Sequence, residues 1–139
     1  MLSSEEIRLI RETASILAKS EISATNLFYA NLFRAAPAVR PMFPEDMFAQ
    51  SAKLWDSVVV VVEGLDDLEK ISPKLRQLGQ RHVGYGAKPA HYAIVAATLI
   101  STIGYLSSDI WTPAHAAAWQ HALEVVASFM IAGANEHAG

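Results

Sequence analysis

The sequence of 139 residues contains no cysteine, which excludes disulfides, zinc sites built on thiolates, iron–sulfur clusters and cysteine nucleophiles. Charge is also sparse, since 11 basic and 14 acidic side chains leave a formal net charge of −3. Nucleic-acid and membrane-surface partners require a basic face, so we expect neither. The longest aliphatic run, the valines at residues 58–62, is far too short to cross a bilayer. The acidic start has no secretory-signal pattern, so we expect a soluble, cytoplasmic protein.

The common enzyme motifs are absent as well. The sequence holds no G-x-S-x-G elbow, Walker loop, Rossmann fingerprint, H-E-x-x-H zinc motif or pair of carboxylates on an apolar face. Gly84 and Gly86 do not follow a predicted strand, so they do not form a phosphate-binding loop. Any chemistry must therefore come from other residues.

Apolar residues make up 52% of the chain and recur at helical spacing along nearly all of it. We predict helices at about residues 3–20, in a segment ending before Pro37, and at about 48–64, 72–84, 89–106 and from 112 onward. No segment is predicted to be a strand. The sequence therefore predicts a single all-α domain over residues 1–139, with about six to seven helices.

Four local patterns refine this prediction. Ser3 and Glu6 form a capping-box pattern at the start of the first helix. The valines at residues 58–62 favour a strand by propensity, but their helical flanks lead us to predict a helix. Ser72 and Pro73 are predicted to begin the fourth long helix, as cap and first helical residue. Three prolines within residues 36–46 predict a rigid corner around Phe43.

Five histidines are present, and a surface or hydrogen-bonded role is the ordinary interpretation of each. His115, His121 and His137 are assigned no function. His82 differs because it shares an apolar helical face with Leu78 and Tyr85. Without a cysteine or acidic partner at ligand spacing, His82 is a poor zinc ligand. It suits an axial ligand to haem, which brings its own equatorial nitrogens.

Apolar side chains elsewhere could form a slot for such a cofactor or, equally, an ordinary core: Phe28, Phe33, Phe43, Leu54, Val58, Val95 and Leu99. Tyr29 and Gln50 favour the slot, because they place polar groups on otherwise apolar faces. A buried hydroxyl and a buried amide need hydrogen-bond partners. If both point into one pocket, they can donate to a ligand on the iron.

Taken together, these residues resemble the bacterial globins of the single-domain and flavohaemoglobin type. Order and spacing agree over almost the whole chain. The motif elements are Phe28-Tyr29-Ala-Asn-Leu-Phe33, Pro41-Met-Phe43, Leu78-x-x-x-His82-x-x-x-Gly86, His91-Tyr92-x-x-Val95 and Trp119.

The resemblance implies a globin fold around haem b, with a distal ligand pocket. Tyr29 matches the distal tyrosine, and Gln50, or Ser51 if the gap falls differently, matches the distal polar residue. Leu54 matches the apolar residue over the iron. Phe43 matches the aromatic residue that stacks on the porphyrin.

On the proximal side, His82 matches the iron ligand, and Tyr92 matches the tyrosine that packs beside it. Lys53 and Arg81 are candidate partners of the haem propionates, or solvated charges. The remaining expected cofactor contacts are Phe28, Phe33, Val58, Leu78, Val95 and Leu99.

Two departures from the family pattern bear on function. Flavohaemoglobins carry a glutamate late in the last helix that hydrogen-bonds the proximal histidine. That register falls on Ala134 here, and the nearest acid is Glu136. A weaker proximal push suits reversible O2 binding better than O–O cleavage. The chain also ends at Gly139 without a flavin or NAD domain, so turnover would need an external reductase.

The function implied is reversible binding of O2, and of CO and NO, by a monomer or weak dimer with an open sixth iron position. One alternative is an enzyme, an NO dioxygenase that detoxifies NO with a separate reductase. A gas or redox sensor is another. A globin module that has lost haem is disfavoured, because it would not need His82, Tyr29 and Gln50 together.

Overall fold

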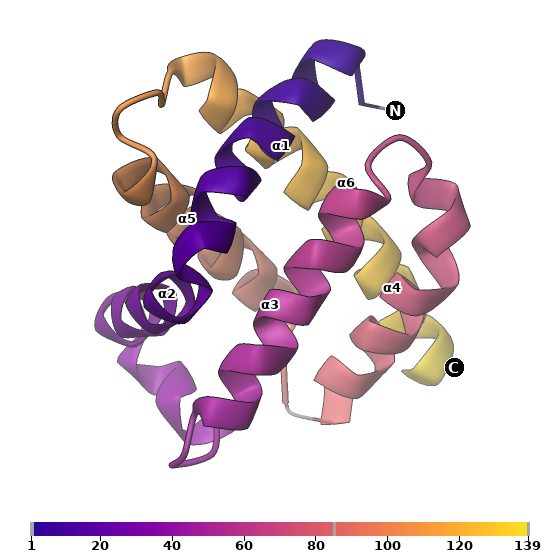
Figure 1. Cartoon of the computed structure of the whole chain (residues 1–139). Coiled ribbons are helices and arrows are strands. Elements are labelled where there is room, and N and C mark those ends of the chain that lie inside the picture. The colour runs from indigo at the N-terminus through magenta and orange to yellow at the C-terminus, as the bar shows by residue number, and fades with distance from the viewer. Residues whose placement is uncertain (1, 85, 139) are drawn as a thin grey trace.

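The structure, a computed structural model, describes residues 2–84 and 86–138 (Figure 1). Tyr85, the burial of Gly84 and the side chains of residues 136–138 lie outside this description. The helices are α1 (Ser4–Leu17), η1 (Ala18–Ser20), α2 (Glu21–Ala35), η2 (Pro37–Met42), α3 (Phe48–Glu63), α4 (Leu68–Gly84), α5 (Pro89–Leu106) and α6 (Pro113–Ala138). No strand occurs among the described residues, so the all-α prediction is confirmed.

The capping box predicted at the start of α1 is confirmed, and α5 begins with a related one. At α1 the Ser3 amide donates to Glu6 Oε1 (2.8 Å), and the Glu6 amide donates to Ser3 Oγ (3.1 Å). At α5 the position that Glu6 holds in α1 is taken by His91, whose Nδ1 accepts a hydrogen bond from the Lys88 amide (3.0 Å). The valines at 58–62 lie inside α3, which confirms helix over strand there.

The predicted start of α4 at Ser72 is wrong. The helix begins at Leu68 and contains Pro73. Leu65 and Leu68 are completely or almost completely buried, with exposed fractions of 1% and 0%. Their burial holds an additional turn ahead of the proline, so tertiary packing outweighs the lost backbone hydrogen bond.

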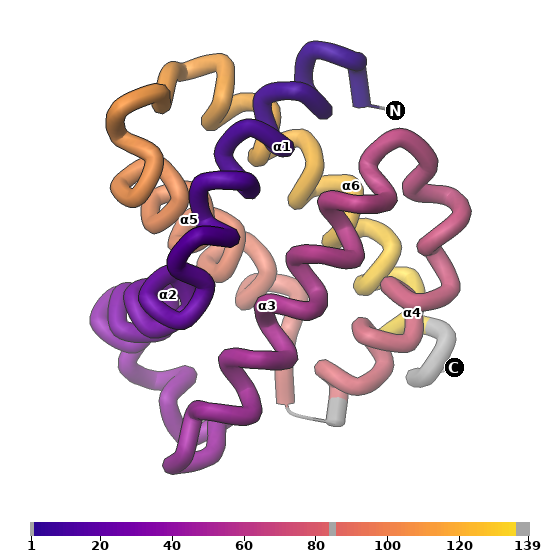
Figure 2. The backbone as a smooth tube through the Cα atoms, in the orientation of Figure 1, coloured from indigo at the N-terminus to yellow at the C-terminus, as the bar shows by residue number. Residues whose placement is uncertain are grey.

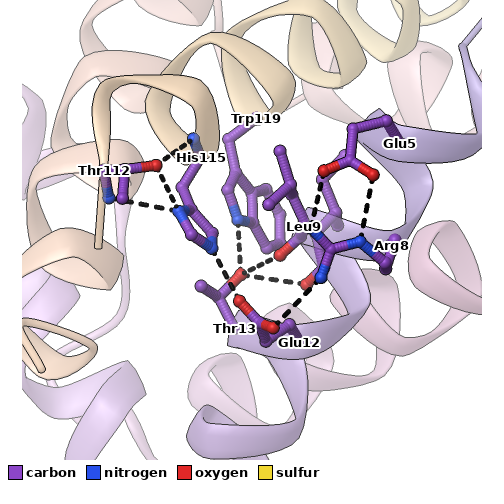
Figure 3. Close-up of polar contacts among 9 residues, drawn as sticks. Glu5, Arg8, Leu9, Glu12, Thr13, Thr112, His115 and Trp119 are labelled. Carbon is purple, nitrogen blue, oxygen red and sulfur yellow. Dashed lines mark hydrogen bonds and ion pairs between the residues drawn. The ribbon is translucent and has the colours of Figure 1, made fainter. Parts of the chain in front are cut away.

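Buried polar contacts join α1 to α6 (Figure 3). Trp119 Nε1 donates to Thr13 Oγ1 (2.8 Å). The Thr112 amide donates to Nδ1 of His115 (3.1 Å), so the proton of the neutral ring is on Nε2, which lies 2.8 Å from Glu12 Oε1. His115 therefore has a structural role, in capping α6 and tying it to α1.

A close crossing of two glycines sets the position of α4. A Cβ atom added to Gly79 would overlap the backbone carbonyl of Met130 in α6. A Cβ atom on Gly133 would overlap the carbonyl of Arg76 in α4. Because neither residue has a side chain, the two backbones touch, and α6 directly supports the helix that carries His82.

Figure 1 shows α3 and α4 towards the viewer, with α5 and α6 behind them, and the tube in Figure 2 follows the same path. By length and composition alone, α5 could cross a membrane. In this fold it lies against α2, where Asn31 donates to Thr102 (3.1 Å), and against α6. In this fold α5 therefore packs against neighbouring helices along part of its surface.

Two apolar clusters end at a shared internal space. One is formed by α2 and the following corner, with contributions from α3 and α5: Phe28, Tyr29, Leu32, Val39, Phe43, Leu54, Val95 and Leu99. The other belongs mainly to α4 and α6: Leu75, Leu78, Tyr92, Val126, Phe129 and Met130. The candidate site lies where these clusters face each other.

Candidate functional site

A cavity of about 710 Å³ lies between α2, α3, α4, α5 and α6. Its walls are mostly apolar, and a few polar side chains project into it, which is the usual character of a cofactor or ligand pocket. All predicted site residues except Phe33 line this one cavity. The residues suggested by helical spacing and those implied by the family resemblance therefore share a common space.

His82 enters the cavity from the last turn of α4, where it is half-buried. Its Nδ1 lies 2.7 Å from the Leu78 carbonyl oxygen. A carbonyl can only accept, so this contact requires the proton on Nδ1 and leaves the lone pair on Nε2. The backbone thus holds His82 in a tautomer that can ligate a metal through Nε2.

Burial also keeps this imidazole neutral. Desolvation lowers the pKa of His82 below its usual 6.5, and the nearby Arg81 charge lowers it further, while the hydrogen bond to Leu78 opposes both. Tyr92 lies beside it, with ring centroids 6.4 Å apart. Burial raises the pKa of the Tyr92 phenol, so Tyr92 is also neutral at pH 7.

Tyr29 and Gln50 line another part of the cavity, from α2 and α3. Tyr29 is only 6% exposed, and Gln50 Nε2 donates to its hydroxyl oxygen at 3.5 Å. Burial raises the pKa of the Tyr29 phenol, against the smaller opposing effect of Gln50. The phenol therefore keeps its proton and can donate it to a third group. Gln50, rather than Ser51, lines the cavity.

An aromatic cluster supports Tyr29. Its ring lies edge-on to Phe28 (5.0 Å) and to Phe43 (5.6 Å), and it stacks on Phe33 (5.9 Å). Phe33 does not reach the cavity. One helical turn after Tyr29, it turns towards the corner and lies under the guanidinium of Arg40. Its contribution is to fix the rings of Tyr29 and Phe43.

Charged and polar side chains also border the cavity. Lys53 and Arg81 are exposed and line it from α3 and α4. His91, which was not predicted as a site residue, also lines it, with Nδ1 bonded to the Lys88 amide. The one feature of the sequence that could have singled out His91 is its place in the first turn of the helix that begins at Pro89. Further lining residues were missed because they look like ordinary core in the sequence: Leu17, Leu32, Trp55, Ile103 and Met130.

The donor set fits haem better than a bare metal ion. Among the described residues, no three histidine, cysteine or acidic side chains gather as a metal site. The cavity instead offers one imidazole, large apolar walls and cationic groups suited to carboxylates. A prosthetic group with its own equatorial ligands needs this arrangement. Ala134 offers no carboxylate in the register expected for the glutamate, and the side chain of Glu136 lies outside the described residues.

Comparisons with known proteins agree with this geometry. The globin family model matches residues 26–130. A flavohemoprotein of Bacillus subtilis is 30% identical over 94% of this chain and 34% of its own length. One from Pseudomonas putida is 32% identical over 99% of this chain and 36% of its own length. The chain therefore spans about a third of the flavohemoproteins it matches.

Proteins of similar length match as well. An uncharacterized globin-like protein of Aquifex aeolicus is 27% identical, over 94% of this chain and 93% of its own length. The crystal structure of a bacterial globin from Campylobacter jejuni superposes with a TM-score of 0.85 at 28% identity. That alignment covers 96% of this chain and 97% of the other.

Proposed function

The chain belongs to the globin family, and from this we propose that it binds haem b through His82 and reversibly binds O2 and other diatomic gases. Bound haem would supply a ferrous iron with one coordination position open to O2, CO or NO. The observation that carries the proposal is that one cavity contains both a histidine in the ligating tautomer and a buried, protonated tyrosine.

The two sides of the cavity have different tasks. His82 would supply the nitrogen that binds the iron, and the Leu78 carbonyl keeps its ring oriented. Tyr29 would donate a hydrogen bond to a bound gas that carries partial negative charge, and Gln50 donates to the Tyr29 hydroxyl. Each such charge-assisted hydrogen bond is worth roughly 1.5–3 kcal/mol, so slow release of O2 is expected.

Other residues would hold the cofactor itself. Phe43 and Leu54 line the cavity, where Phe43 would offer an aromatic ring to the porphyrin and Leu54 would limit the space for the gas. Lys53 and Arg81 are cations on the cavity wall and suit the two propionates.

The absorption spectrum of the purified protein tests this proposal. Reduced protein with added haem should give a Soret band, and CO should shift it. His82→Ala should abolish the ferrous five-coordinate spectrum. If the wild-type protein gives no Soret band with added haem, the proposal is wrong. A six-coordinate ferrous spectrum in the absence of added ligand would contradict the open sixth position.

NO dioxygenation with an external reductase is the second candidate, favoured by the similarity to flavohemoproteins. Ala134 argues for binding over turnover, because a carboxylate that would increase electron donation through the proximal histidine is missing from that register. NO consumption in the presence of NADH and a flavin reductase separates the two. Sustained consumption identifies a dioxygenase, and a single stoichiometric reaction identifies a carrier.

A further inference from the structure

The cavity extends well beyond the two polar groups that define the ligand site. Its apolar end reaches the cluster between α1, α5 and α6, where Leu17, Ile103 and Trp119 line it. Trp55 of α3 borders the same end and packs against this cluster. Small apolar molecules can therefore occupy space inside the protein beyond the distal pocket.

A second hollow of about 280 Å³ lies outside, between α1 and α3. Its α1 side is lined by the small side chains of Ala14 and Ser15, followed by Ala18 of η1, and its α3 side by larger ones. At the end of α3, Arg11 donates to the carbonyl oxygens of Val62 (3.3 Å) and Glu63 (3.4 Å). These bonds hold the two helices together beside the groove.

Trp55 and Val58 line both the outer groove and the inner cavity. At this point the two spaces are therefore separated by residues of a single helix, α3. Rotation of a single side chain could connect the two spaces, and side-chain rotation is fast compared with most ligand-binding steps.

We propose that the α1–α3 groove is the docking site and access route for the diatomic gas, and that Trp55 is the partition it passes. This rests on the proposed function. An uncharged diatomic molecule favours apolar surroundings over water. The route past Trp55 and Val58 is largely apolar, whereas Lys53, Arg81 and His91 place polar and charged groups elsewhere on the cavity wall.

Laser flash photolysis of the CO-bound protein tests this route. Ser15→Trp fills the groove from an exposed position that does not line the inner cavity. We expect the bimolecular CO association rate to fall several-fold and the fraction of CO that rebinds before escaping to rise. Because the same passage serves release, the dissociation rate should fall by the same factor and the affinity should stay unchanged.

Two further variants complete the set. Ser128→Trp places the same bulk on an exposed position of α6 that lines neither space, and it should behave as wild type. Trp55→Ala should raise the CO association rate several-fold. If Ser15→Trp and Trp55→Ala both leave the rates unchanged while Gln50→Ala accelerates them, the gas passes beside Gln50 and the proposal is overturned.

Xenon-pressurised crystals provide a readout that does not depend on haem. Xenon bound in the groove and at the inner end of the cavity would support the route, and xenon confined to the inner cavity would oppose it. Failure of the proposed function would instead appear as a missing Soret band, so the two failures are distinguishable.

Discussion

Burial sets the protonation state of the two side chains on which the site depends. It raises the pKa of the Tyr29 phenol and lowers that of the His82 imidazole, so both are neutral at pH 7. The phenol is then a donor, and the imidazole carries a lone pair. Their hydrogen bonds to Gln50 and to the Leu78 carbonyl fix which atom does each task.

Tyr29→Phe tests the distal donor. Loss of one charge-assisted hydrogen bond should speed O2 dissociation by roughly 10- to 100-fold, since such a bond is worth about 1.5–3 kcal/mol. CO dissociation should change much less, because CO gains little negative charge on binding. Stopped-flow measurements with both gases check this, and equal effects on O2 and CO would reject the assignment of Tyr29.

Glu6 gives a prediction about acid stability. The backbone amide of Ser3, and secondarily His121, lower the pKa of Glu6 below 4.5 in the folded protein. A lowered folded pKa means that the stabilisation is complete above about pH 4.5 and is lost as pH falls through the folded value. The unfolding free energy of Glu6→Gln should therefore fall less steeply in acid than that of wild type.

Urea unfolding at a series of pH values from 7 to 3 measures how steeply the unfolding free energy falls with pH. His121→Gln removes only the second partner of Glu6 and should flatten the slope in part. Identical slopes in wild type and Glu6→Gln would show that the contact has no effect in solution.

At the scale of elements, the crossing of α4 and α6 is the contact most sensitive to a single atom. Gly79→Ala and Gly133→Ala each force a methyl group against the opposing backbone, which cannot move aside as a side-chain tip can. We expect each to lower the unfolding free energy by about 1–3 kcal/mol and to speed haem loss, since α4 carries His82.

Gly64→Ala is the matched control, because its Cβ would meet only side-chain atoms of Ile71 and a carbonyl oxygen at 3.0–3.3 Å. It should cost less stability and leave haem loss unchanged. Chemical unfolding and haem transfer to an apoglobin acceptor measure the two effects. If Gly79→Ala is as mild as Gly64→Ala, the backbones are not in the contact described.

The helices themselves were largely predictable because their signals are local. The capping box at Ser3, the proline at the start of α5 and the helical period through the valines of α3 all held. The predicted helix start at Ser72 and Pro73 was wrong, since a proline can lie inside a helix when the turn before it is buried. Leu68 supplies that burial, and this fact belongs to the packed molecule.

At the scale of the whole molecule, residues of two apolar clusters line one cavity. A ligand that binds only the folded state stabilises it by about 2.7 kcal/mol at a hundredfold excess over Kd. Added haem should therefore raise the melting temperature by roughly 10 °C. Differential scanning calorimetry of wild type and His82→Ala checks this. An equal rise in both would show that His82 is not the ligand.

The sequence by itself determined most of the helices, the absence of thiol chemistry, and the globin resemblance that points to Tyr29, Phe43, Gln50 and His82. Each of these rests on spacing along the chain or on residue type. Which helix faces pack together, and how far their side chains are buried, depends on contacts between residues far apart in sequence. Only the tertiary structure therefore shows that Phe33 packs against Tyr29 and does not line the cavity, and that His115 of α6 contacts Glu12 of α1. It also shows that Trp55 borders two spaces.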